Sequence, residues 1–141
     1  MSWTKLDIVK AAFEEIGFAT YVYDASSEQL ESILRRLDMM VSTWYANGVN
    51  LGYPIYNDPK LSTLDQASNL PVIAVEAVYL GLAVRIAPMF GKVLNPDTKI
   101  NAQNAFNAMI NSMAEIPEKS FPSTLPAGAG NIYNWNNFII I

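Results

Sequence analysis

The acidic side chains are the main candidates for chemistry, because the sequence contains no cysteine and no histidine. This composition excludes thiol nucleophiles, the usual zinc ligand sets and the serine–histidine–aspartate triad. Catalysis would therefore rest on carboxylates, acting as acid and base on either side of one bond. The adjacent Glu14 and Glu15 fall in a predicted helix, where neighbouring side chains point about 100° apart. They would not face one substrate bond, and no other acidic pair is clearly placed in a cleft.

Glu76 and Arg85 are the charged side chains inside the most apolar stretch, residues 70–88. They are nine residues apart, so on a helix of about 3.6 residues per turn they point to opposite faces. Each therefore needs a partner from another element or another subunit. For Arg85, two interpretations remain open: a charge pair with another subunit, or bonds to helix carbonyls inside its own subunit. These charges favour a central core helix over a membrane-spanning one.

Aromatic residues at the end of an earlier helix are candidate contact anchors, since aromatic side chains dominate many interfaces. Trp44 and Tyr45 could bind a neighbouring subunit, and the alternative for Trp44 is a place in the core. Ala77 and Gly81 are small residues four positions apart, which would allow another helix to approach closely.

Apolar spacing and capping signals predict four helices that position these residues. The predicted starting caps and ending residues of the four helices are Thr4–Gly17, Ser26–Gly48, Asn69–Pro88 and Asn95–Pro117. In the third, Asn69 is the predicted N-cap, Pro71 lies in the first turn and Pro88 ends the helix. The fourth has an apolar stripe of Ile100, Phe106, Met109, Ile110, Met113 and Ile116. Residues 51–68 form a loop, and loops of this length are often contact surfaces. The predicted fold class is all-α, a small four-helix bundle.

Composition favours an assembly component. The chain of 141 residues has the size of one domain, and only 16% of its residues are charged while 51% are hydrophobic. Part of its surface is therefore expected to be buried against other chains. The net charge of −4 argues against a broad phosphate-binding surface. No signal peptide is apparent, so we expect assembly in a cytoplasm.

The last 25 residues have no helical periodicity and are predicted to form an extended arm. Prolines and glycines lead into a sharply apolar end that contains Tyr133, Trp135, Phe138, Ile139, Ile140 and Ile141. Such an end is either an aggregation hazard or a docking strand, and solubility favours docking. The predicted division is a helical domain over residues 1–116 and an arm over residues 117–141.

Three groups of residues, in order along the chain, carry a family resemblance. They are Leu37, Met40, Trp44-Tyr45, Gly48 and Gly52-Tyr53; then Ala77-Val78-Tyr79, Leu82-Ala83 and Arg85-Ile86-Ala87-Pro88; and finally Pro122-Ser123, Leu125-Pro126, Gly128 and Gly130-Asn131. Across residues 4–131 the chain resembles the tail accessory factor of short-tailed bacteriophages, also called the head-to-tail adaptor or packaged-DNA stabilisation protein. After Asn131 it departs from the family, whose members can carry a longer polar tail.

The resemblance implies a structural virion protein, without cofactor or enzymatic activity, in the neck between head and tail. Twelve copies would form a ring beneath the portal protein, extend the DNA channel and offer a platform for the tail nozzle or hub. Genomic double-stranded DNA would pass through without sequence-specific binding, and no membrane is involved. The candidate contact residues are then Trp44, Tyr45, Tyr53 and Arg85, together with the apolar arm residues named above.

The sequence leaves two alternative functions. A tail-associated peptidoglycan hydrolase could work with paired carboxylates and needs no histidine or cysteine. A DNA-binding terminase-type subunit is disfavoured by the missing basic patch.

Overall fold

The computed structural model describes residues 2–18 and 24–114, which fold into four α-helices joined by loops and two short 3-10 turns. The elements are α1 (Lys5–Glu15), α2 (Ser27–Ala46), η1 (Pro59–Leu61), α3 (Val72–Ile86), η2 (Ala87–Phe90) and α4 (Pro96–Met113). The all-α prediction is confirmed for these residues, among which no strand is assigned.

The predicted helix starts at α1, α2 and α4 are confirmed. Thr4 and Asp7 form a reciprocal capping box at α1, and Ser26 and Gln29 form another at α2. At α4 the Asn95 side chain accepts a hydrogen bond from the Asp97 backbone N–H. These caps satisfy N–H groups that have no partner within their own helix.

The predicted start of α3 is wrong by two residues. Asn69 is not the N-cap: its φ is 53°, a left-handed conformation that asparagine tolerates better than most residues. Pro71 takes the N-cap position in an extended conformation, without a side-chain hydrogen bond, and the helix begins at Val72. The proline restricts the residue before it to extended conformations, so the helix cannot begin earlier. At the other end, Pro88 falls within η2, directly after α3.

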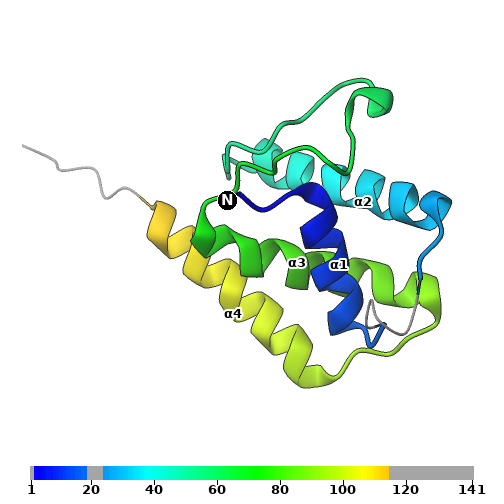
Figure 1. Cartoon of the computed structure of the whole chain (residues 1–141). Coiled ribbons are helices and arrows are strands. Elements are labelled where there is room, and N and C mark those ends of the chain that lie inside the picture. The colour runs from blue at the N-terminus through cyan, green and yellow to red at the C-terminus, as the bar shows by residue number, and fades with distance from the viewer. Residues whose placement is uncertain (1, 19–23, 115–141) are drawn as a thin grey trace, which may run out of the picture.

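Helix α3 is the centre of the molecule. Figure 1 shows it between α2 and α4, with α1 lying across it, and α3 contacts all three. Its buried residues are Ala74, Val75, Ala77, Val78, Leu80, Leu82, Ala83 and Ile86. Glu76 and Arg85 are exposed, and neither forms an ion pair within the described residues. The alternative of a partner from another element of the same chain is therefore wrong for the described residues, and a partner from another subunit stays a prediction.

By length and composition, Val72–Phe90 could cross a membrane, with a mean hydropathy of 1.7. Half of this segment is buried inside the protein, against α1, α2 and α4. Packing of this kind is typical of the core helix of a globular domain.

Helix α4 is covered less completely than its apolar stripe predicts. Met109 is its one fully buried residue, while Ala105, Phe106 and Ile110 pack partly against the core. Ile100 and Met113, which the stripe predicts to be inside, are 56% and 36% exposed. α4 packs on α3 along one side, so a wide stripe cannot be buried in this chain alone.

The long loop between α2 and α3 is fastened to the start of α1. The backbone N–H groups of Lys5 and Leu6 donate to the carbonyls of Gln66 and Leu64, both at 3.0 Å. The Ser68 side chain also donates to the Trp3 carbonyl at 2.6 Å. The loop thus uses first-turn donors of α1 that the helix itself leaves unpaired.

Candidate functional site

A buried lysine holds α1, α2 and the long loop together. Lys5 is fully buried, and its Nζ donates to Ser62 Oγ at 2.7 Å. It lies 3.5 Å from Asp38 Oδ1 on α2 and 3.5 Å from the Pro54 carbonyl. Asp38 also accepts a hydrogen bond from the Tyr53 hydroxyl. The ammonium is therefore satisfied on several sides by groups from three parts of the chain.

The electrostatics of this cluster indicate a structural cation. Burial lowers the pKa of Lys5, while the neighbouring Asp38 carboxylate works in the opposite direction. The ammonium also lies 4.7 Å from the Tyr53 ring centroid and 5.5 Å from that of Tyr56, where cation–π attraction favours the charged form. The hydrogen bond to Ser62 and the contact with Asp38 therefore give Lys5 a structural role that joins the loop to the helices.

Tyr53, a predicted contact residue, is part of this interior instead. Its side chain is buried, and burial, followed by the nearby Asp38, raises the pKa of its hydroxyl. The ring therefore presents no open surface to a neighbouring subunit, whereas Ile55, Tyr56 and Leu61 of the same loop are exposed.

The aromatic pair at the end of α2 divides between core and surface. Trp44 is half-buried and stacks against Phe106 of α4, with ring centroids 5.0 Å apart. Its indole also lies against Gly81, where an added Cβ would be 3.4 Å from the ring. Tyr45 is 58% exposed and stays available for contact. The close approach predicted at Gly81 is confirmed, because a side chain there would crowd α2.

Arg85 lies with two other arginines on an open surface across α2 and α3. Ser32, Arg35, Arg36 and Met39 line this hollow together with Arg85. Sequence reasoning missed the cluster, since Arg35 and Arg36 are far from Arg85 along the chain. Among the described residues Arg85 makes no hydrogen bond or ion pair, so the interpretation that it satisfies helix carbonyls is wrong.

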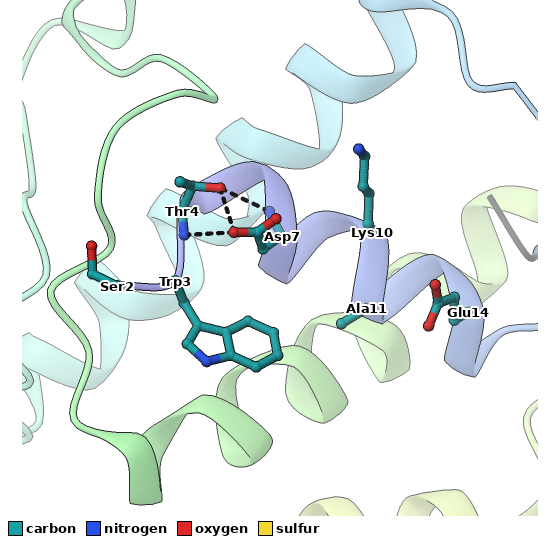
Figure 2. A pocket seen from close by; sticks show the side chains of 7 residues that line it. All are labelled: Ser2, Trp3, Thr4, Asp7, Lys10, Ala11 and Glu14. Carbon is teal, nitrogen blue, oxygen red and sulfur yellow. Dashed lines mark hydrogen bonds between the residues drawn. The ribbon is translucent and has the colours of Figure 1, made fainter.

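A second open hollow runs beside α1 and brings two acids to one side of the helix. Figure 2 shows Asp7, Lys10 and Glu14 along this side, with the Trp3 indole at its N-terminal end. Hydrogen bonds from the Thr4 backbone and hydroxyl lower the pKa of Asp7. A glycoside-cleaving acid needs a raised pKa, so Asp7 is unsuited to the role of general acid.

The arm residues, from Tyr133 to Ile141, lie outside the described residues, as does the predicted domain boundary at residue 116. Among the described residues, no group of acidic side chains is placed to hold a metal ion.

The sequence did contain a signal for the buried lysine. Lys5, Ile8, Val9 and Ala12 recur with helical spacing and are all buried, so the lysine falls on the apolar face of α1. A cation on that face requires an anion from elsewhere in the fold. Asp38, which lies one residue after Leu37 in the apolar stripe of α2, is that anion.

One known protein family matches this helical chain over nearly its whole length. The family model described as the P22 tail accessory factor matches residues 1–139, which is nearly the whole sequence. This match agrees with the residue pattern noted around Trp44, Arg85 and Gly128. The chain therefore belongs to the P22 tail accessory factor family and is a structural protein of a bacteriophage tail.

Proposed function

We propose that this protein is the head-to-tail adaptor of its virion, a four-helix domain with an extended C-terminal arm. In this role, copies of the chain form a ring under the portal protein and extend the DNA channel. The ring helps to retain the packaged DNA and gives the tail nozzle or hub a surface to bind. Membership of the P22 tail accessory factor family supports this assignment.

The observation that carries the proposal is the amount of apolar surface left uncovered on one chain. The exposed large hydrophobic side chains are Trp3, Met39, Tyr45, Ile55, Tyr56, Leu61, Val72, Ile73, Met89, Val93, Ile100 and Met113. They come from the segment before α1, α2, the long loop, the start of α3, the η2 turn and loop that follow α3, and α4. Exposed aromatic and methionine side chains are the kind that subunits of a closed assembly bury against one another.

The charge balance fits a channel through which DNA moves. A net charge of −4 gives the chain no general attraction for phosphates. DNA could slide past such a wall without being held at particular sequences.

The arm supplies the attachment to the portal in this proposal. Its apolar end, residues 132–141, can dock as an added strand or fill pockets on a partner. The described part of the chain ends at Ala114, so 27 residues remain beyond it. Fully extended they reach on the order of 90 Å, well past the edge of the domain.

The test is a binding experiment with the purified portal protein. The full chain and a variant lacking residues 132–141 are each mixed with portal, and the products are imaged and quantified by pull-down. We expect the full chain to form a ring on the portal. The truncated chain should keep its helical circular dichroism and melting temperature but bind at least about tenfold more weakly, since much of the interface energy is removed.

Two results would overturn the proposal. One is a full chain that stays monomeric and unbound in the presence of portal. The other is capture of the truncated chain at full strength, which would remove the arm from the attachment.

A further inference from the structure

All three arginines of this acidic chain gather on one face. Arg35 and Arg36 are exposed on α2, Arg85 is exposed at the end of α3, and all three line the same hollow with Ser32 and Met39. No acidic residue lines that hollow. None of the arginines forms an ion pair within the described residues, although Arg35 also lines a separate hollow with Glu31, Asp38 and Asp65. Arg36 and Arg85 are therefore the more available charges of this face.

Two glutamates lie on the side of α3 that faces away from Arg85. Glu76 precedes Arg85 by nine residues, which turns its side chain about 180° away around the helix. Tyr79 follows Glu76 by three residues, so their side chains lie on the same side of α3, and Glu15 is the last residue of α1, which packs against α3. Burial raises the pKa of the half-buried Tyr79, and the charges of Glu76 and Glu15 act in the same direction. Both are exposed, and neither has an ion-pair partner in the described part of the chain.

The central helix therefore separates two faces of opposite charge. We name the surface of Arg35, Arg36, Met39 and Arg85 the arginine face, and the surface of Glu15, Glu76 and Tyr79 the glutamate face. A surface that must meet an identical copy of itself across a two-fold axis gains nothing from carrying a single sign of charge. Complementary faces on opposite sides suit head-to-tail contacts, which repeat around a ring.

The composition of the arginine face favours a protein partner over DNA. Met39 is 63% exposed and lines the hollow with the three arginines. Arginine and methionine are both enriched in protein interfaces, and an exposed thioether gains nothing from a phosphate. The remainder of the chain is acidic enough to leave a net charge of −4, which would oppose a polyanion close by.

We propose that the arginine face of one copy docks on the glutamate face of the next copy, and that this contact sets the order and direction of the subunits in the ring. The inference depends on the proposed ring and names the surfaces that form it. Charge pairing of this kind contributes orientation and selectivity, while apolar side chains such as Met39 contribute most of the binding energy.

The experiment reverses each face and then both. One variant carries Arg36→Glu with Arg85→Glu, a second carries Glu15→Arg with Glu76→Arg, and a third carries all four changes. Lys99→Glu, at an exposed position on α4, is the control for a charge change away from both faces. The oligomeric state of each is measured by native mass spectrometry and sedimentation, alone and with portal protein, after circular dichroism has verified folding.

We expect each two-site variant to associate at least about tenfold more weakly than the unmodified chain, because like charges then face each other. The four-site variant should regain assembly, since its faces are complementary again with the signs exchanged. Mixing the two two-site variants should restore a closed ring of alternating copies, because every contact then joins the acidic faces of one variant to the basic faces of the other. The control should assemble normally.

The outcomes separate this inference from the proposed function. If the unmodified chain forms its ring and the two-site variants assemble equally well, the charged faces are not the contact, while the ring proposal stands. If the unmodified chain forms no ring with portal, the proposed function itself fails. If the arginine variants assemble normally but lose salt-sensitive binding of double-stranded DNA, the arginine face is a phosphate-binding surface and the inference is overturned.

Discussion

The substitution Lys5→Met tests whether the buried ammonium holds the long loop against the helices. Methionine keeps the length of the side chain and removes its charge. The change eliminates the 2.7 Å hydrogen bond to Ser62, and a charged hydrogen bond is worth about 1.5–3 kcal/mol. It also removes the countercharge of Asp38, whose side chain is 17% exposed and keeps its bond from Tyr53.

Part of that loss of stability is offset, because folding of the variant does not require a charged ammonium to be removed from water. We therefore expect Lys5→Met to lower the free energy of unfolding by about 2–3 kcal/mol. Asp38→Asn should cost more, about 3–5 kcal/mol, since it leaves a buried ammonium without its anion. The double variant should lose less than the sum of the two, because the partners share one interaction.

Two measurements check this expectation. Urea unfolding followed by circular dichroism gives the global free energy. Limited trypsin digestion reports on the loop, since Lys60 lies in η1, exposed and at the far side of the Ser62 contact. Cleavage after Lys60 should accelerate in Lys5→Met before the helices unfold. The control is Lys10→Met, a substitution at an exposed lysine of the same helix. Its free energy of unfolding should stay within about 0.5 kcal/mol of that of the unmodified chain, and trypsin should cleave after Lys60 at the same rate in both.

Strictly additive losses in the double variant would refute the coupling of Lys5 to Asp38. An unchanged rate of cleavage at Lys60, with lower global stability, would show that the lysine stabilises the helices without holding the loop.

Two further expectations concern the same core. Tyr53 keeps its proton in the folded chain above its ordinary pKa of 10.0, so its contribution to stability is present below pH 10 and is lost as the pH rises further. Tyr53→Phe should therefore unfold in less urea at pH 8, yet lose less stability than the parent chain between pH 10 and 11. At Gly81, a leucine should cost about 1–3 kcal/mol by crowding Met40 and Trp44. Alanine there should cost under about 1 kcal/mol, because the Met40 thioether 3.3 Å away can shift and alanine favours the helix. Thermal melts of both Gly81 variants measure this difference.

Local patterns determined which helices could be predicted correctly. Capping boxes at Thr4 and Ser26 fix helix starts through contacts three residues apart, which a sequence displays directly. Apolar spacing likewise identified the faces of α1 and α2 that the structure buries. The start of α3 was missed because Asn69 adopts a left-handed backbone conformation instead of the extended one of an N-cap.

Contacts between distant segments account for what the sequence did not predict. Tyr53 was expected on a surface, but the loop folds back so that its hydroxyl reaches Asp38. The arginine face depends on how α2 packs beside α3, and nothing in the separate stretches around Arg36 and Arg85 indicates that they meet. Ile100 is exposed because α4 packs mainly against α3, which is a property of the arrangement and not of its own stripe.

The central place of α3 also governs how the protein can be made. When the ribosome has finished α2, the new chain has the outer layers of the domain but lacks the helix at its centre. α1 and α2 therefore have few apolar partners until about residue 86 has left the exit tunnel, and stable structure must form late and in one step. Nascent chains arrested before that point should be digested readily by protease, and this timing delays the display of assembly surfaces until translation is nearly complete.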